Sequence, residues 1–422
     1  MYDAPTTTAT SATGPERAEG TANVPEGAVV VDFSHHSDTL AECPFETLAD
    51  LRRTAPVAWS TAHDGFWVVT NHQDVMDGLA DYGRFTSSFG PAIPANPFGT
   101  RHIPVGLDPP LHTIYRRALQ TWFNKSEVTR REPEVKALIA EIVQDLAERR
   151  SWDFVSDLAD VSPGAVTLGI LGWDSSRRLD LLGVMARGLK NSASTDPAVV
   201  AQNAEGNRWI REQILAEARD RRAHPREDLM TVLSTEPIAD GALMNDEEIS
   251  DTVVFLLLAG FHTTSGALTA LLVQMARQPE LRARLMEDRG LIPAAIEEAI
   301  RIYAPVTALA RRVTEDTELG GTRMSKGHWA LFVNMAANHD PDAFPEPEMF
   351  DLTRNRAKSV AFGWGVHRCM GLHLARAILR LEVEAVFDLL PDHVIDLDGT
   401  RRAHHLGIGY FYETVPAHLP PT

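Results

Sequence analysis

A cysteine lies in a glycine-rich stretch near the end of the chain, directly before an amphipathic helical pattern. The stretch reads FGWGVHRCMG and ends at Gly371, with the cysteine at position 369. Backbone N–H groups at a helix N-terminus and in a glycine-bent loop can stabilise a thiolate. A thiolate ligand to haem iron favours cleavage of the O–O bond. An isolated cysteine is more often a small buried apolar residue, but these surroundings make Cys369 the candidate iron ligand.

The same stretch resembles the haem-binding signature of the cytochrome P450 family, F-x-x-G-x-[HR]-x-C-x-G, at every fixed position. Two segments before it resemble the same family in the same order. Glu298 and Arg301 match its E-x-x-R helix, and Asn338-His-Asp-Pro341 resembles the segment that leads to the cysteine loop. The spacing of Glu298 and Arg301 is also that of an ordinary surface ion pair, so its weight comes from the series of matches.

The resemblance implies a mainly α-helical fold with small β-sheets, in which a long central helix crosses a haem b group held by the Cys369 thiolate. It implies that Glu298 and Arg301 form a structural ion pair behind the cysteine loop. Buried haem propionates need charge-assisted donors. The resemblance gives that role to His112, Arg116, Arg311 and His367, and it places Phe362, Gly363, Ala259 and Gly260 against the haem. His112 and Arg116 are also compatible with an exposed polar pair on one helix face.

The longest apolar run, residues 253–261, is followed directly by His262, Thr263 and Thr264. By resemblance, this segment is the part of the long helix where dioxygen is activated. Thr263 is then the candidate proton relay, with His262 and Thr264 beside it. The family usually has an acidic residue at position 262, but a histidine with an unperturbed pKa of about 6.5 can also carry protons at neutral pH. A polar notch in a core helix is the structural alternative.

Three functions remain open, and His262 motivates the second of them. The leading one is a monooxygenase that uses dioxygen to hydroxylate or otherwise oxidise a small to medium hydrophobic substrate, terpenoid-like or another natural product. The second keeps the haem-thiolate centre but performs peroxide-driven oxidation or oxidative coupling. The third is a haem sensor or carrier without turnover, in which the threonine relay would have no role.

Residues 87–110 are rich in proline, glycine and apolar side chains without a helix or strand period. Connections of this length are uncommon unless they are functional, so the segment is expected to select the substrate, the alternative being an irregular surface loop. The candidate pocket residues come from this loop, from the long helix and from the segment after the E-x-x-R helix: Phe89, Ile93, Phe98, Phe261, Val306 and Leu309.

Electrons are expected from a separate ferredoxin and ferredoxin reductase that draw on NAD(P)H, because two cysteines cannot ligate an iron–sulfur cluster in addition to haem. An acidic ferredoxin would bind a basic patch on the thiolate side of the protein. The side chains that could form it are Arg116, Arg117, Lys125, Arg130, Arg131 and Arg368. Scattered solvated charges are the alternative.

The composition excludes several other classes of partner. The formal net charge of −18 disfavours nucleic acid and anionic membrane surfaces. The N-terminal residues lack a signal-peptide core, and the longest apolar run is well short of the roughly 20 residues of a spanning helix. Two cysteines provide no disulfide framework, which suits a reducing compartment. The expectation is a soluble, cytoplasmic monomer.

Hydrophobic periodicity predicts helices over residues 111–123, 132–150, 177–192, 204–223 and 371–390. It predicts strands over 57–60, 66–70, 317–321 and 329–332. Asn245 and Glu248 form a capping-box pattern, and a helix from there to Pro279 would be about 50 Å long. No break in composition follows the Thr- and Ala-rich start, so residues 1–27 are expected to be a disordered tail and 28–422 a single haem-binding catalytic domain.

Overall fold

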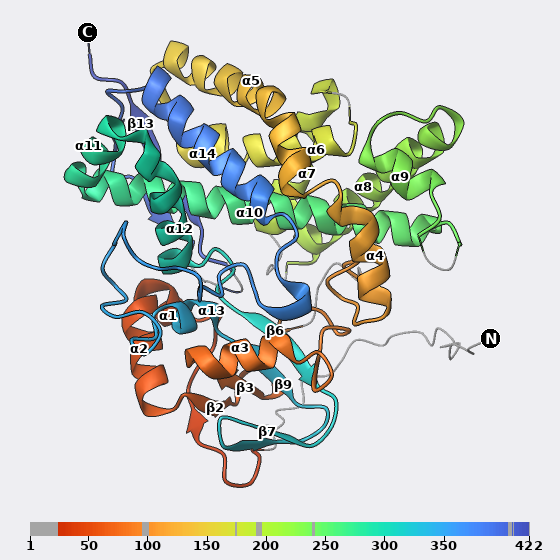
Figure 1. The fold of residues 1–422 in the computed structure, drawn as a ribbon, viewed down its shortest axis with the longest axis vertical. Helices are drawn as coiled ribbons and strands as arrows, with labels where there is room; N and C mark the ends of the chain where they lie inside the picture. Colours follow the sequence, from red (N-terminus) through yellow and green to blue (C-terminus); the bar gives the residue numbers. More distant parts are fainter. Residues whose placement is uncertain are drawn as a thin grey trace.

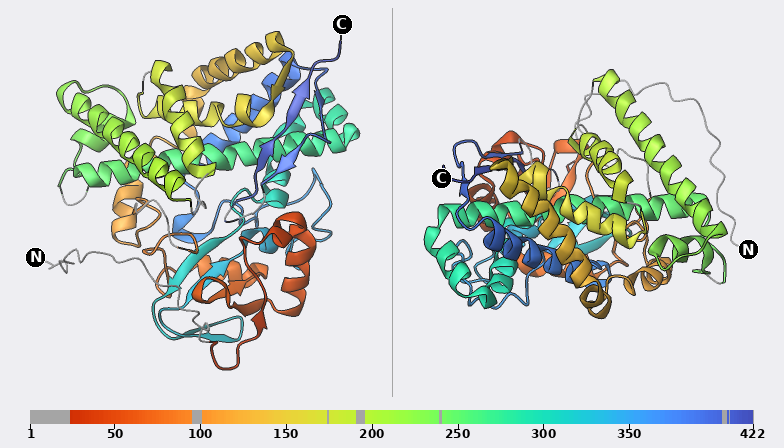
Figure 2. Two further views of the ribbon diagram at one scale, coloured as in Figure 1. Left: turned by 180° about the vertical axis from the view of Figure 1, so that it is seen from behind. Right: turned by 90° about the horizontal axis from the view of Figure 1, so that it is seen from above.

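The computed structural model describes residues 24–94, 101–173, 175–190, 196–238, 241–403, 407 and 409–421. A large helical part and a smaller sheet-containing part lie on opposite sides of one long helix (Figures 1 and 2). The mainly helical architecture with small sheets confirms the predicted fold class. The expected N-terminal tail falls almost wholly outside the described residues, so the division into a tail and a single domain stays a prediction.

The largest sheet has six strands in the order β1-β2-β3-β9-β6-β4. Strands β2 and β3 form an antiparallel hairpin, and β3 also pairs in parallel with β9 on its other side. The apolar runs of β2 and β3 are buried on both faces, as in a covered sheet, rather than alternating. The strands are β1 (Val30–Val31), β2 (Val57–Ser60), β3 (Phe66–Val69), β4 (Phe85–Thr86), β6 (Leu309–Val313) and β9 (Trp329–Phe332).

Fourteen α-helices occur within the described part of the chain. They are α1 (Asp38–Glu42), α2 (Pro44–Thr54), α3 (His72–Ala80), α4 (Leu111–Gln120), α5 (Lys125–Arg149), α6 (Ser162–Ile170), α7 (Ser175–Lys190), α8 (Pro197–Ala223), α9 (Leu229–Thr235), α10 (Asp246–Arg277), α11 (Pro279–Glu287), α12 (Ile292–Tyr303), α13 (Asn334–Asn338) and α14 (Leu372–Leu389).

Helix α10 is the long central helix that the sequence predicts. Its 32 residues begin at the expected capping box, in which the Asn245 side chain accepts from the Glu248 backbone and the Glu248 side chain accepts from the Asn245 backbone. The helix crosses the molecule between the sheet part and the helices α5, α6 and α14 (Figure 1). It is long and apolar enough to span a membrane, but 72% of its apolar window is buried inside the protein. This burial is that of a core helix.

Helix α5 begins seven residues earlier than the sequence analysis expects, at Lys125 instead of position 132. Pro133 lies inside the helix rather than at its first turn. The true start is set by Asn124, whose side chain accepts a hydrogen bond from the backbone N–H of Glu127. Proline within a helix costs one backbone hydrogen bond, and here the cap and the packing of α5 on α14 outweigh that cost.

The remaining strands form three small sheets. The C-terminal strand β13 (Pro416–His418) pairs with both β10 (Val394–Ile395) and β5 (Ser151–Asp153). The pair β11 (Arg401–Arg402) and β12 (Tyr412–Thr414) and the hairpin β7 (Thr317–Leu319) and β8 (Thr322–Met324) are two-stranded. Directly after β5 lies a π-helical turn, η2 (Val155–Ala159). Since β13 returns to β5, the last residues of the chain fasten the segment that precedes α6.

A buried carboxyl group links α14 to α6. Glu382 is fully buried, accepts a hydrogen bond from the Ser162 hydroxyl through Oε1, and has an Oε2 without a partner among the described residues. Burial raises its pKa from 4.5 to about 8, although the Ser162 hydrogen bond opposes the shift. Glu382 therefore carries its proton at neutral pH, because its charged form would lose solvation without gaining a cation.

We expect the stability of the wild-type protein to fall relative to Glu382→Gln as pH rises from about 5 to 8. The folded pKa lies above the unfolded value, so this stabilisation is complete below about 4.5 and is lost as pH rises through about 8. The difference in unfolding free energy between the wild type and Glu382→Gln should change by at most about 1.4 kcal/mol per pH unit. Denaturant unfolding at several pH values measures it. Glu384→Gln, two residues along on the half-exposed face, serves as the control, and parallel wild-type and Glu382→Gln curves would refute the assignment.

Candidate active site

The cysteine loop is shaped by glycines and by backbone hydrogen bonds. The Cys369 N–H donates to the Phe362 carbonyl at 2.8 Å, which folds the loop back on itself just before α14. Gly363 and Gly365 both have a φ of 69°, in the left-handed region. A Cβ on Gly365 would stand 2.7 Å from the Cα of Ala80, so this glycine is also required for the loop to approach α3. The backbone geometry therefore explains why glycine is needed at positions 363 and 365.

The positive charges around the Cys369 thiol oppose the effect of burial on its pKa. Burial raises the pKa of the thiol, whereas the Gly371 backbone and the guanidinium groups of Arg116, Arg376 and Arg368 lower it. The net direction is upward, so the protein alone keeps a thiol there. A bound metal ion deprotonates a coordinating thiol, and the three cations would then stabilise the thiolate.

Three predicted propionate ligands are buried, and the two histidines among them have unsatisfied ring nitrogens. The imidazole rings of His112 and His367 lie 4.3 Å apart, and none of their four ring nitrogens has a hydrogen-bond partner in the described structure. Nε2 of His367 is 3.7 Å from Oδ1 of Asp108, which is too long for a hydrogen bond. Arg311 is 1% exposed, and the acceptor recorded for its guanidinium is the Ala310 carbonyl. The four unsatisfied ring nitrogens and the buried guanidinium of Arg311 are groups that a haem with two carboxylates would pair with, so the residues fit the group.

Replacing Arg311 with methionine should accelerate loss of haem about tenfold while stabilising the apoprotein. Burial lowers the pKa of Arg311 to about 10 although the negative charge of Asp108 opposes the shift, so the charge of Arg311 is costly in the protein alone. Haem transfer to a scavenging apoglobin and unfolding of the apoprotein measure the two effects. Arg312→Met is the matched control, because Arg312 packs over Phe89 and Trp329. Equal haem loss from both variants would contradict the assignment.

Arg116 fastens α4 to the cysteine loop. Its Nη2 donates to the Arg368 carbonyl at 2.7 Å, one residue before Cys369. Burial lowers the pKa of Arg116, and the negative charge of an ionised Cys369 opposes that shift. The predicted propionate ligand Arg116 thus lies against the sulfur side of the loop, whereas His112, on the same helix, faces His367.

The predicted ion pair of Glu298 and Arg301 is the centre of a larger buried cluster. Both side chains are 0% exposed and bind through two hydrogen bonds of 2.8 and 3.0 Å. Glu298 also accepts from Arg354 and Arg356 at 3.0 Å each. Burial would raise the pKa of Glu298, but these guanidinium groups lower it below its ordinary range. Arg301 in turn donates to the carbonyls of Asn338 and Pro347, so the cluster fastens the segment that leads to Cys369.

The middle of α10 carries a partly exposed stripe on an otherwise buried helix. Ala259 is exposed, and Thr263 is half-buried with its hydroxyl donating to the Ala259 carbonyl at 2.8 Å. Thr264 is buried, since it lies about 100° further round the helix. A Cβ on Gly260 would stand 2.7 Å from the Thr167 hydroxyl, so the small residue there lets α10 approach α6. The predicted catalytic residues Thr263 and Thr264 therefore lie on different faces.

Next to His262 lies a carboxyl group from elsewhere in the chain. Oδ1 of Asp160, at the end of η2, is 3.7 Å from Nδ1 of His262 and accepts a hydrogen bond from Ser265 at 2.6 Å. Burial raises the pKa of Asp160 to about 6, against the opposing Ser265 hydrogen bond. Burial lowers the pKa of His262 to about 4. The acid that is missing from position 262 is thus supplied from a different segment.

The predicted pocket residues do not all come together. Ile93 and Phe261 are buried, and Val306 and Leu309 are half-buried, with Leu309 3.8 Å from a Cβ built on Gly363. Phe89 is 53% exposed and packs against Arg312 and Trp329. Phe98 lies outside the described residues. Leu309 is the member of this set that the structure brings to the cysteine loop.

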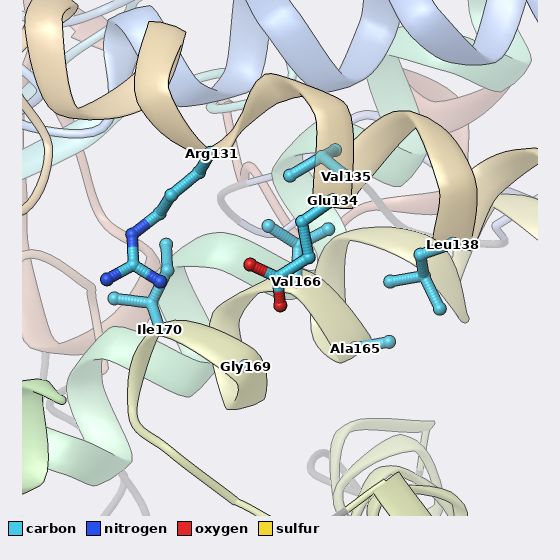
Figure 3. Close-up of a pocket in the computed structure, with 8 residues that line it drawn as sticks. All are labelled: Arg131, Glu134, Val135, Leu138, Ala165, Val166, Gly169 and Ile170. Carbon is cyan, nitrogen blue, oxygen red and sulfur yellow. The ribbon is translucent and has the colours of Figure 1, made fainter. Parts of the chain in front are cut away.

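A small hollow of about 80 Å³ opens between α5 and α6 (Figure 3). Its lining includes none of the predicted catalytic, haem-binding or pocket residues. Arg131 and Ile170 lie at one end of it and Leu138 and Ala165 at the other. This hollow is therefore not the substrate site.

Asp160 and Asp108 escaped the sequence analysis. Asp160 supplies the carboxylate beside His262. Phe411 lies with its ring 5.6 Å from the His262 ring. Asp108 accepts from the Thr86 and Ser88 hydroxyls and from the Ser87 N–H beside His367. Phe411 lies in the chain between Tyr410 and Tyr412, which are both buried.

The fold and the cysteine loop define a haem-thiolate protein, and known proteins agree. The model of the family described as Cytochrome P450 matches residues 208–389. A Steroid C26-monooxygenase of Mycobacterium tuberculosis (strain CDC 1551 / Oshkosh) is 32% identical over 336 residues, covering 78% of this chain and 88% of that protein. Cytochrome P450-terp of Pseudomonas sp is 29% identical over 415 residues, covering 93% and 94%. The structure of Mycobacterium marinum cytochrome P450 CYP268A2 in complex with pseudoionone superimposes with a TM-score of 0.85 at 25% identity, covering 94% and 100%.

The chain therefore belongs to the cytochrome P450 family. It is a bacterial-type monooxygenase that uses haem with a cysteine thiolate ligand. Membership confirms the predicted enzyme class and cofactor. It also means that the reaction uses dioxygen, a hydrophobic substrate and electrons from a redox partner.

Proposed function

We propose that this enzyme inserts one oxygen atom into a terpenoid-like hydrophobic natural product, with Cys369 as the axial ligand. The cysteine loop carries the proposal, because it joins a glycine-shaped backbone, three nearby cations, the unsatisfied rings of His112 and His367 and the buried guanidinium of Arg311. The substrate class is supported by relatives named for steroids and by the similar structure that holds pseudoionone. Steroids and pseudoionone are both isoprenoid.

The residues of the site have separate roles in this proposal. When bound, the haem supplies activation of dioxygen and transfer of one oxygen atom to a C–H bond. Arg311, His112 and His367 hold the propionates through charge-assisted hydrogen bonds. Ala259 keeps the exposed stripe of α10 free of large side chains, and Leu309 offers apolar surface to the substrate beside Gly363.

Protons reach the site through Asp160, His262 and Thr263. The Asp160 carboxyl, with a pKa of about 6, exchanges protons readily near neutral pH. A small rotation of the His262 ring brings Nδ1 from 3.7 Å to hydrogen-bonding distance of Asp160. The Thr263 hydroxyl then passes a proton from the stripe of α10 toward the reacting oxygen. The peroxide-driven alternative loses its motivation, because the carboxylate that position 262 lacks is present nearby.

Electrons come from a ferredoxin that binds beside the cysteine loop, in an enzyme that is a soluble, cytoplasmic monomer. Arg117, Lys125 and Arg368 are exposed, and the positive charges of Lys125, Arg368 and Arg376 together lower the pKa of His373 after the effect of burial. Arg130 and Arg131 contribute less, because both pair with Glu127. A KM for ferredoxin that rises steeply with salt would support this surface, and an unchanged KM would reject it.

A spin-shift titration of the purified enzyme tests the substrate class. We expect acyclic or cyclic terpenoids or steroids to shift the ferric Soret band with micromolar affinity and to be oxidised when ferredoxin, its reductase and NAD(P)H are supplied. Fatty acids and aromatic amino acids of similar size are the controls. Shifts with the controls but with no isoprenoid would overturn the proposed class, and efficient turnover with hydrogen peroxide alone would restore the alternative chemistry.

A further inference from the structure

Three histidines meet at the edge of the large sheet, in segments that have no part in the haem-thiolate chemistry. His35 and His36 lie between β1 and α1, and His63 lies in the 3-10 turn η1 (Ala62–Asp64) that joins β2 to β3. One ring nitrogen from each histidine lies within 4.8 Å of the other two. The ring centroids are 4.2 Å apart for His35 and His36, 5.2 Å for His36 and His63, and 5.7 Å for His35 and His63.

We propose that His35, His36 and His63 bind a divalent transition metal of the zinc type, separate from the haem. Imidazole nitrogens are preferred ligands of Zn²⁺, Ni²⁺ and Cu²⁺. Three protein ligands leave a fourth position to water, as in many zinc sites. Zn–N bonds of about 2.0–2.1 Å hold tetrahedral nitrogens about 3.4 Å apart, so the rings must close by roughly 1.5 Å. The exposed ring of His63 can rotate to do this.

The hydrogen bonds of His35 and His36 indicate which ring nitrogen of each carries the hydrogen. Both Nε2 atoms lie close to the Ile93 carbonyl oxygen, at 2.6 Å for His35 and 2.9 Å for His36. A carbonyl oxygen only accepts, so each Nε2 carries the hydrogen and the lone pair of each neutral ring is on Nδ1. Metal-binding histidines usually donate their other N–H to a carbonyl or carboxylate in this way. Two rings therefore already have the tautomer that a metal needs.

One ring nitrogen of the cluster is buried and unsatisfied. His35 is 2% exposed, and its Nδ1 is buried without a hydrogen-bond partner in the part of the chain that the structure describes. Leaving a buried imidazole nitrogen unsatisfied is unfavourable, and a metal ion would satisfy it. Burial and the neighbouring His36 lower the pKa of His35 to about 3, so the ring is neutral at pH 7. Burial also lowers the pKa of His63.

A metal bound at this site would also restrain the loop after β4. Ile93, whose carbonyl accepts from two of the histidines, belongs to the segment that also reaches β6 through the hydrogen bond from Ala310 N–H to the Pro91 carbonyl at 2.7 Å. A metal held by the three histidines would fix the rings of His35 and His36, which both donate to the Ile93 carbonyl. The ion therefore fastens the chain before α1, the β2–β3 turn and the start of the loop to one another.

Zinc binding to the holoenzyme tests the site directly. Calorimetric titration with ZnCl₂ and elemental analysis after gel filtration should give one zinc per chain beside the haem iron, with micromolar or tighter affinity. His36→Ala and His63→Ala should each weaken zinc binding at least tenfold and leave the haem spectrum unchanged. The matched control is the double variant His224→Ala/His418→Ala, which removes two exposed histidines outside the cluster.

Two further results decide the proposal. Zinc should slow backbone hydrogen exchange in residues 87–94 of the wild type but not of His63→Ala, because the ion fixes the donors to Ile93. Millimolar affinity, or equal zinc binding by the wild type and His63→Ala, would show an adventitious ion only and overturn the site. Tight binding without slower exchange would overturn the link to the loop.

Discussion

Glu298→Gln is expected to lose about 3–5 kcal/mol of folding free energy and most of its haem. The Glu298 carboxylate receives hydrogen bonds from three arginines, and Arg301 among them is completely buried. An amide keeps the shape but removes the charge, so the guanidinium groups are left without a counter-charge in a desolvated cluster. The arginines also hold the segment before Cys369, and disorder there would reach the iron ligand. Denaturant unfolding and haem per chain measure both losses.

Glu287→Gln is the control for this variant, because Glu287 is an exposed carboxylate on the neighbouring helix α11. It should behave as the wild type in both measurements. Full haem content and unchanged unfolding in Glu298→Gln would mean that the cluster is not what fastens the loop.

Asp160→Asn is expected to lower the rate of coupled product formation about 100-fold, while haem content and the reduced carbon-monoxide spectrum stay the same. The carboxyl donates protons only when protonated, so the wild-type rate should fall as pH rises above about 6. This inflection should vanish in Asp160→Asn. Ser265→Ala should move it upward, because the Ser265 hydrogen bond lowers the pKa of Asp160. NAD(P)H consumption, peroxide release and product are measured together, with an isoprenoid that gives a spin shift.

Asp145→Asn, at an exposed carboxylate of α5, controls for the change of charge. Its rate and pH profile should match those of the wild type. An unchanged pH profile in Asp160→Asn would exclude this carboxyl from proton delivery and leave His262 without its partner.

The predictable part of the site is the part that is local in sequence. The cysteine loop, the capping box of α10 and the E-x-x-R pair are short motifs whose partners lie within ten residues, so spacing alone indicates them. Strands β2 and β9 were predicted with their observed bounds, because compact apolar runs bounded by turn residues leave little freedom. The predicted start of α5 was wrong, because proline is typical of a first helical turn and Pro133 was given more weight than the helix cap at Asn124.

The rest depends on contacts between distant segments. Asp160 and His262 are 102 positions apart, and Arg354 and Arg356 join Glu298 across more than 50, so no periodicity reveals them. The histidine cluster joins adjacent residues to a turn 27 positions further on, through strand pairing that brings β1 beside β2. Phe89 is apolar, as a pocket residue should be, but whether its side chain is buried depends on the path of the loop along the sheet edge.

The reduced, carbon-monoxide-bound absorption spectrum of the wild type beside Cys369→Ser and Cys43→Ser tests the central claim most directly. Cys43 is exposed, so its replacement controls for the loss of a thiol. We expect a Soret band at about 450 nm in the wild type and in Cys43→Ser, and its loss in Cys369→Ser. A band at about 420 nm from well-folded wild type, or one at about 450 nm that survives in Cys369→Ser, would contradict ligation of the iron by Cys369.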